Sequence, residues 1–264
     1  MLKMKLMVSL LLIVLTTALI GGLTGAWFTD TESAGTATFT AGRLDIDVPD
    51  GLSDFNLLLD YGSKHGHMNP GDLYDPITIQ IRNTGTKNVA WFGDWIFTPT
   101  VEGADKLLDK MYIETMSMSF IDIDGNPWNT DPWYSGYDFI VNGKGNFVGH
   151  NQGEADFFDG LAAMSPDGVI TLRNWNDNAN MAPGSTFEHM GALKPGENRY
   201  VLKVVLGFHK SAGNEYQGDA EGVSPITIGF NINATQINAE AMDALFPGLG
   251  THFDWMNTQI NVQP

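Results

Sequence analysis

Apolar and polar residues alternate with a period of two along much of the chain, and this pattern predicts β-strands. Clean alternation covers residues 77–81, 116–123 and 224–237, and apolar or aromatic runs at 89–97 and 199–208 have the length of buried strands. Each run is rich in β-branched or aromatic residues and is bounded by Gly, Pro, Asn or Asp. The sequence therefore predicts an all-β fold, an antiparallel β-sandwich.

Helical periodicity is confined to residues 103–111 and 239–246, each long enough for one short helix. The middle of the chain has weak periodicity and is dominated by Asn, Gly, Trp and Asp. We expect one domain over residues 49–264 that carries a long, loop-rich insertion at about residues 100–195. A connection of that length between core strands is unusual and often has a function of its own.

The first 26 residues have the three parts of a secretory signal peptide. Lys3 and Lys5 precede an apolar run at residues 6–20, and the small residues Thr24 and Ala26 lie three and one positions before the expected cut. A retained membrane anchor is the alternative, but the run is shorter than the roughly 20 residues that span a bilayer. We expect signal peptidase to remove residues 1–26 and the mature chain to be secreted, without a membrane partner.

Charge and cysteine content narrow the possible functions. The chain has 14 basic and 31 acidic residues, and loss of Lys3 and Lys5 with the leader leaves 12 basic residues and a net charge of −19. Nucleic acids and anionic lipids would be repelled, whereas divalent cations are permitted; solubility in an external medium explains the charge equally well. The absence of cysteine excludes thiol catalysis, Cys-ligated zinc and iron–sulfur clusters.

Several motifs occur in a fixed order at the two ends of the mature chain. They are Trp-Phe-Thr-Asp at residues 27–30, Ala-Thr-Phe-Thr-Ala-Gly-Arg-Leu-Asp-Ile at 37–46, Pro-Gly-Asp at 70–72, a strand ending in Asn-Thr-Gly at 79–85, Asn-Glu-Tyr-Gln-Gly at 214–218, and a strand ending in Ala-Thr-Gln at 228–236. In this order they resemble the TasA/camelysin family. Residues 100–195 show little likeness to it.

The resemblance implies a jelly-roll sandwich that assembles into extracellular filaments, pili or fibres of a biofilm matrix. In that family the mature N-terminal segment of one subunit is inserted as a strand into the next subunit, so the expected partner is the chain itself, as a head-to-tail homopolymer. Residues 27–48 fit the donor role, with the following side chains able to fill pockets: Trp27, Phe28, Phe39, Leu44 and Ile46.

The same segment has a second interpretation, in which residues 36–48 form the first strand of their own sheet. For residues 43–48 both interpretations stay open, because their apolar alternation suits an ordinary strand. For residues 27–40 we favour the donor role.

Some camelysin-type relatives have been classed as metallopeptidases, which raises the question of a zinc site. A zincin needs two histidines one helical turn apart with a glutamate between them, and the chain has no His-Glu-x-x-His sequence. His65 and His67 could offer two ligands, with Asp60 or Asp72 nearby, but a solvated loop pair explains them more simply. We expect that the protein is not an enzyme.

One acidic turn is a candidate for calcium. Carboxylate and amide oxygens at close spacing suit a hard cation, and this group comprises Asp122, Asp124, Asn126 and Asp131. The turn lacks the closing glutamate of an EF-hand, and Asp-x-Asp-Gly-Asn is also a common hairpin sequence. A plain turn is therefore the alternative, and we expect no other cofactor.

An aromatic group in the insertion suggests a different function. Exposed aromatic rings could stack on sugars, which would make the protein a monomeric cell-surface glycan-binding module; the residues concerned are Trp128, Trp133, Tyr134, Tyr137 and Trp175. We prefer the alternative that they form a satellite core beneath the insertion. The main hypothesis is a secreted structural subunit of an extracellular filament, with the glycan-binding module and the metallopeptidase as competitors.

Overall fold

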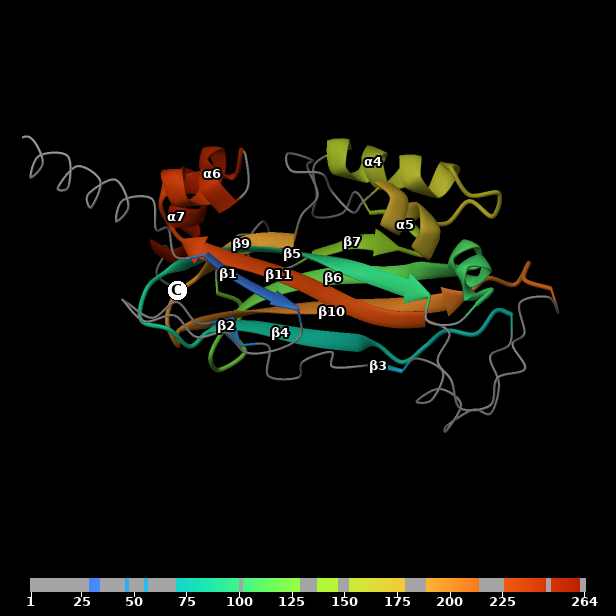
Figure 1. Cartoon of the computed structure of the whole chain (residues 1–264), viewed down its shortest axis with the longest axis horizontal. Coiled ribbons are helices and arrows are strands. Elements are labelled where there is room, and N and C mark those ends of the chain that lie inside the picture. Colours follow the sequence, from blue (N-terminus) through green and yellow to red (C-terminus); the bar gives the residue numbers. More distant parts are fainter. Residues whose placement is uncertain are drawn as a thin grey trace, which may run out of the picture.

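The structure is a computed structural model, and it describes residues 29–33, 46–47, 55–56, 70–99, 102–128, 137–146, 152–178, 189–213, 226–245 and 248–261. Two sheets whose paired strands all run antiparallel pack face to face (Figure 1). The prediction of an all-β, antiparallel fold is confirmed.

The first sheet, sheet A, has the order β1-β11-β5-β9, and β3 also pairs with β11. Its strands are β1 (Thr29–Ser33), β3 (Phe55–Asn56), β5 (Val89–Pro99), β9 (His189–Leu193) and β11 (Ile226–Gln236). Sheet B has the order β2-β4-β10-β6-β7-β8. Its strands are β2 (Ile46–Asp47), β4 (Ile77–Asn83), β6 (Met111–Asp122), β7 (Tyr137–Val141), β8 (Lys144–Gly145) and β10 (Asn198–Phe208).

The main core lies between the two sheets and follows the period of two. Every second residue of β4 is buried, and β10 and β11 bury their alternate residues in the same way over most of their length. Sheet A adds the large side chains of Trp91, Trp95 and Phe97. Phe120 of β6 stacks on Tyr200 of β10 with ring centroids 4.4 Å apart. These strands are the ones that the sequence predicts best.

Helices cover part of the sandwich. They are η1 (Ala104–Asp109), α4 (Gln152–Ala163), α5 (Leu172–Asn178), α6 (Ala239–Leu245), η3 (Leu249–His252) and α7 (Phe253–Asn261). Of these, η1 and α6 confirm the two short helices expected from the sequence. Within the described part of the chain, no helix has the length and apolar character needed to cross a membrane.

The helices occupy two places. Met242 of α6 and Met256 of α7 pack with Ala90 and Ala192 in a second apolar cluster, on the face of sheet A that points away from the main core. Phe158 of α4 and Trp175 of α5 instead extend the main core. Figure 1 shows these two pairs of helices along the same upper side of the sandwich.

The segment at residues 100–195 differs from a loop-rich insertion. It contributes β6, which lies between β10 and β7 inside sheet B, and then β7, β8, α4 and α5. The hairpin between β7 and β8 turns at Asn142 and Gly143, whose positive φ angles of 53° and 74° match an Asn-Gly turn. This part of the chain therefore builds the edge of the sandwich in addition to its loops.

Candidate functional site

The outer edge of β11 is covered by two short strands from the N-terminal part of the chain. β1 pairs with it from Thr29↔Thr235 to Ser33↔Asn231, and β3 pairs with it at Phe55↔Ile228. The other edge of β11 is paired along its whole length with β5. A strand of 11 residues therefore depends on strands of 5 and 2 residues to cover its free edge.

The edge of β4 in sheet B is covered in the same manner. β2 pairs with it only at Ile46↔Asn83 and Asp47↔Arg82, whereas β10 pairs along most of its other edge. β2 and β3 lie on the side of the sandwich away from α4 and α5 (Figure 1). One N-terminal segment thus supplies the edge strand of both sheets.

The strands under this cover are strongly apolar on their inner face. β11 buries Ile226, Ile228, Phe230, Ile232 and Ala234, and β4 buries Ile77, Ile79 and Ile81. If the edge strands left, unpaired main-chain groups and the border of an apolar core would both face water. Such an edge accepts another strand readily.

The strand β1 brings no apolar residue to this edge, because its sequence is Thr-Asp-Thr-Glu-Ser. Its pairing with β11 therefore rests on main-chain hydrogen bonds, which any strand can supply.

The opposite side of the sandwich is closed by side chains of α5. β9 pairs with β5 from Val89 to Gly93. Beyond Gly93, this edge of β5 has no strand partner among the described residues. Trp175 Nε1 donates to the carbonyl of Trp95 at 3.0 Å. The side-chain amide of Asn176 forms hydrogen bonds with both main-chain groups of Phe97. Asn176 Oδ1 accepts from the N–H of Phe97 at 3.2 Å, and Asn176 Nδ2 donates to the carbonyl of Phe97 at 2.5 Å.

The helix α4 closes the edge of sheet B on that same side. The N–H of Gly145 in β8 donates to Asp159 Oδ1 at 3.1 Å. A Cβ atom at Gly145 would lie only 2.3 Å from the carbonyl oxygen of Ala155, so the helix backbone sits directly against the strand. Only glycine permits this approach. The two sides of the sandwich are thus closed by different parts of the chain.

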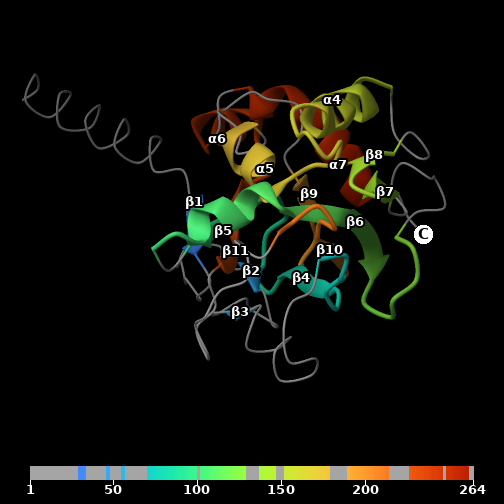
Figure 2. The same cartoon turned by 90° about the vertical axis from the view of Figure 1, so that its right-hand side faces the viewer.

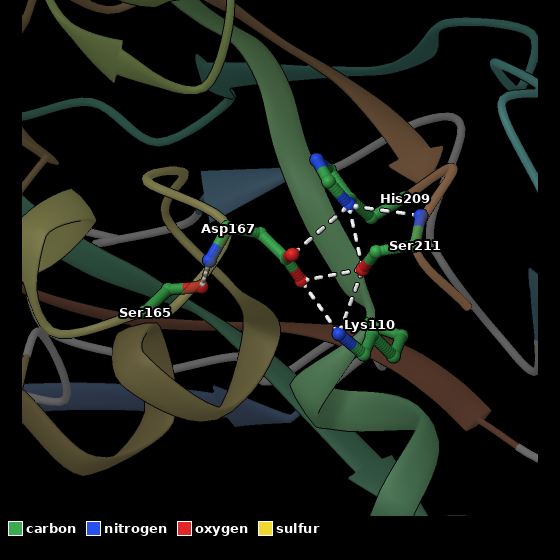
Figure 3. Close-up of polar contacts among 5 residues, drawn as sticks. All are labelled: Lys110, Ser165, Asp167, His209 and Ser211. Carbon is green, nitrogen blue, oxygen red and sulfur yellow. Dashed lines mark hydrogen bonds and ion pairs between the residues drawn. The ribbon is translucent and has the colours of Figure 1, made fainter. Parts of the chain in front are cut away.

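A polar cluster joins the insertion to the ends of β6 and β10 (Figure 3). Lys110 Nζ lies 2.6 Å from Asp167 Oδ2 and donates to Ser211 Oγ at 2.8 Å. Ser211 Oγ donates to Asp167 Oδ2 at 2.9 Å, and His209 Nδ1 lies 3.4 Å from Asp167 Oδ1. Burial raises the pKa of Asp167, but the hydrogen bonds from Lys110 and Ser211 and the charges of His209 and Lys110 together hold it below its ordinary value.

The geometry of this cluster does not activate a nucleophile. His209 Nδ1 accepts the N–H of Ser211 at 3.2 Å and lies 2.9 Å from Ser211 Oγ, so one ring nitrogen faces both the hydroxyl and the carboxylate of Asp167, to which that hydroxyl donates. A serine triad instead needs the imidazole between the hydroxyl and the carboxylate, with one ring nitrogen for each. Lys110 is held as an ion pair. The cluster therefore ties residues 165–167 to the sandwich.

The predicted donor residues are only partly placed. Trp27, Phe28, Phe39 and Leu44 lie outside the described residues. Ile46 begins β2 and pairs with the chain's own β4, which agrees with the own-sheet interpretation at that position. In this single chain residues 29–33 also pair with their own sheet. The exchange of this segment between subunits stays a prediction.

The predicted calcium residues form a closed hairpin turn. Asp122 Oδ1 accepts from the N–H of Asn126 at 2.8 Å, and Oδ2 accepts from Asn126 Nδ2 at 3.0 Å. The hydrogen bonds from the Asn126 side chain and the turn N–H groups lower the pKa of Asp122. Asp124 is exposed and Asp131 lies outside the described residues. The plain-turn alternative describes this geometry, and calcium binding stays a prediction.

The histidine pair cannot be placed. His65, His67 and Asp60 lie outside the described residues, and only Asp72 is described. Within the ranges that the structure describes, no three His, Cys, Asp or Glu side chains gather as a metal site would need. The zinc question therefore rests on the sequence.

Two of the five aromatic residues of the insertion are buried. Trp128 is 4% exposed, packs 5.6 Å from the ring of Phe120 and lies under the ammonium group of Lys194. Trp175 is fully buried. Both residues belong to the main core, so they are buried as the structural alternative expects, but they do not form a separate satellite core. Trp133 and Tyr134 lie outside the described residues, and Tyr137 begins β7.

The edge contacts of α5 were not expected from the sequence, although one signal was present. Thr171 Oγ1 accepts the N–H of Asn174 at 3.1 Å, which is the hydrogen bond of a helix N-cap. The pattern Thr-Leu-Arg-Asn before Trp175 could have indicated a helix start. No sequence signal links Asn176 to Phe97, which lies 79 residues earlier.

Comparison with known proteins gives one match. Residues 1–91, about a third of the chain, match the family model described as camelysin metallo-endopeptidase. The matched region contains the N-terminal segment and β4 and ends within β5. No curated protein and no solved structure matches the chain.

Proposed function

We propose that this chain is a secreted structural subunit of an extracellular filament. The match of its first 91 residues to the camelysin family model supports a link to the TasA/camelysin family, whose members are extracellular or cell-surface proteins. In this proposal the leader is cut after residue 26. The mature chain, a jelly-roll subunit as in its family, then polymerises head to tail by donor-strand complementation.

The proposal rests on the short N-terminal strands that pair with the edges of β11 and β4. Both edges are closed by the segment at residues 29–56, and its contribution to β11 is short and, in β1, wholly polar. The same segment of a second copy could make the same main-chain hydrogen bonds in place of the chain's own. Exchange of an identical element between copies needs no new interface.

The closed opposite side gives the proposed polymer its direction. Trp175, Asn176 and Asp159 occupy the edges of β5 and β8, so the insertion blocks strand addition there. Each subunit then has one accepting side and one donor segment. A contact between unlike surfaces does not close on itself and extends into a filament.

The role of β1 can be tested by removing its hydrogen-bonding capacity. In a pairing strand one of two adjacent residues donates its N–H toward the partner, so the double substitution Asp30→Pro, Thr31→Pro removes that donor. We expect residues 27–264 to form filaments in negative-stain electron microscopy and the proline variant to stay monomeric. Its circular dichroism melt should still show a folded sandwich.

The matched control is Asp30→Ala, Thr31→Ala, which changes the same side chains but keeps both N–H groups. It should assemble like the unchanged chain, because β1 contributes main-chain bonds. Normal filaments from the proline variant would reject the proposal. An equal loss of filament assembly in the alanine control would also reject it, because the side chains of β1 would then account for the effect.

We also propose that the protein is not an enzyme, although the matched family is described as an endopeptidase. The sequence has no His-Glu-x-x-His helix, and Ser211 is engaged by Asp167 and Lys110. Incubation of the mature chain and zinc with a denatured protein substrate should give no cleavage. Cleavage that is lost with His65→Ala, His67→Ala would reverse this conclusion.

A further inference from the structure

One asparagine of β11 lies in the sequence context of an N-glycosylation site. Asn233-Ala234-Thr235 has the pattern Asn-x-Thr with a residue other than proline in the middle, and no other Asn-x-Ser or Asn-x-Thr sequence occurs in the chain. Side chains alternate between the two faces of a strand, so the asparagine of this sequence points either into the core or out of the sandwich. The structure decides between the two.

Asn233 lies on the face of sheet A that is turned away from the main core. The adjacent residues Ile232 and Ala234 are buried, whereas Asn233 is half-buried and Asn231 is exposed. Opposite Asn233 on β5 is Phe92, which packs against the second apolar cluster beneath α6 and α7. Figure 2 shows α6 on the side of β11 that is turned away from β4. The Asn233 side chain therefore points out of the sandwich, on the same face as these helices.

The surface beside Asn233 is open toward the middle of β11. A Cβ atom at Gly229, on the same face, would meet the carbonyl oxygen of Ile96 at 3.9 Å and no nearer atom of the described residues. Asn231, between Gly229 and Asn233 on this face, is exposed. Nothing in the described part of the chain covers the strip from Gly229 to Asn231, which leaves room for a bulky group attached at Asn233.

The side-chain amide of Asn233 is available for substitution. Other asparagines use this group to hold the fold; Asn83 and Asn174, for example, donate it to main-chain carbonyls. Asn233 makes no side-chain hydrogen bond within the described ranges. The pairing of β11 with β1 and β5 uses main-chain atoms, so a group on Asn233 Nδ2 leaves both ladders intact.

We propose that Asn233 carries an N-linked oligosaccharide. Transfer forms a bond between Asn233 Nδ2 and the anomeric carbon of an oligosaccharide held on a lipid phosphate. The bond from that carbon to the phosphate oxygen breaks, the lipid carrier leaves as its phosphate, and the amide loses one proton. Thr235 supplies the hydroxyl by which the sequence is recognised, and it is fully buried in the folded chain. Transfer therefore takes place on the extended chain during export, before the sandwich closes.

The position of the glycan has a consequence for the surface. It stands roughly perpendicular to β11, away from the edge at which β1 pairs, so it does not obstruct strand pairing. It also adds a bulky hydrophilic group next to the half-buried Phe92, at the border of the second apolar cluster. This part of the face is then closed to direct contact with another protein.

Mass spectrometry of the protein secreted by its source cells tests the site. Cleavage after Glu221 and Glu240 releases residues 222–240, and we expect this peptide to carry an oligosaccharide that fragmentation places on Asn233. Residues 27–264 made in a bacterial cytoplasm without N-glycosylation give the unmodified reference mass. Asn233→Gln should lose the addition entirely, and Thr235→Ser should keep it, because serine retains the hydroxyl.

The matched control is Asn231→Gln, which changes an exposed asparagine of the same face outside the recognised sequence and should leave the addition in place. An unmodified peptide from the secreted, unchanged chain would overturn the proposal, whatever the variants do. An addition that persists in Asn233→Gln would overturn it as well.

The inference rests on the export step of the proposed function and is otherwise independent of it. Secreted protein that forms filaments without the oligosaccharide would reject the glycan alone. Secreted protein that carries the oligosaccharide but forms no filaments would reject strand exchange alone. Protein that keeps residues 1–26 and stays inside the cell would overturn both.

Discussion

At the scale of single residues, Asp94 is the group whose ionisation departs most from its ordinary behaviour among carboxylates in the described ranges. It lies on β5 beside Trp95, and burial raises its pKa from 3.8 to about 7, although hydrogen bonds from the Trp95 backbone and the Trp175 side chain act in the opposite direction. The protonated form is therefore favoured in the folded state. Trp175 belongs to α5, so the ionisation of Asp94 affects the place where the insertion meets sheet A.

The sign of the pH effect follows from this raised pKa. Between about pH 4 and pH 7 the folded chain binds a proton that the unfolded chain releases, so the contribution of Asp94 to stability falls as pH rises and is lost above pH 7. At 1.4 kcal/mol for each pKa unit, the effect is at most about 4 kcal/mol.

We predict that Asp94→Asn removes this loss of folding stability at high pH. Urea unfolding at pH 5 and pH 8 should show the variant gaining stability relative to the unchanged chain at pH 8, with a smaller difference at pH 5. The control Asp177→Asn, an exposed carboxylate on α5, should shift both values equally. A difference between Asp94→Asn and the unchanged chain that does not vary with pH contradicts the assignment.

The sequence predicts the environment of some residues and not of others. Ile77, Ile79 and Ile81 are buried as their alternation predicts, because a strand with one buried face fixes which side each residue takes. Asp94 carries no such signal, because its raised pKa results from burial in the folded chain, where its contacts include Trp175, 81 residues later. The same holds for Lys110, Asp167 and Ser211, which only the fold brings together.

At the scale of elements, the bond between α5 and β5 carries a prediction of its own. Asn176→Ala removes two hydrogen bonds and leaves both main-chain groups of Phe97 without that partner. We expect a loss of about 1–3 kcal/mol in the free energy of unfolding, measured by urea denaturation.

The control for this prediction is Asn178→Ala in the same helix. Asn178 Nδ2 donates to Asn174 of its own helix and the residue is exposed, so the substitution should change stability by about 0.5 kcal/mol or less. Equal effects of the two substitutions would mean that helix formation, and not closure of the β5 edge, accounts for the loss.

The sequence predicts the long secondary-structure elements better than the short ones. Long strands such as β10 and β11 carry enough alternation to be recognised, as does the short helix α6. The helix α5 has 7 residues, of which Leu172 and Trp175 are buried, too few to establish a helical period. Short strands such as β8 exist because of their neighbours, since α4 packs directly against Gly145.

At the scale of the whole molecule, the sandwich has two unlike sides. The insertion closes one side through α4 and α5, and the N-terminal segment covers the other through β1, β2 and β3. The proposed strand exchange uses the difference between these two sides.

Pairing of β1 of one copy with β11 of another can be tested through the register of the two strands. Thr31 lies opposite Asn233, and the chain has no native cysteine. Two single variants, Thr31→Cys and Asn233→Cys, are mixed, allowed to assemble and oxidised, and the products are separated on a denaturing gel without reductant.

Strand exchange predicts a disulfide-linked dimer of one chain of each variant, and a ladder of higher multimers from the double variant. A mixture of Thr31→Cys with Gln80→Cys, which lies in sheet B, should give no such dimer. Monomers alone from the first mixture, together with an internal disulfide in the double variant, would show that β1 stays on its own subunit and would rule out strand exchange.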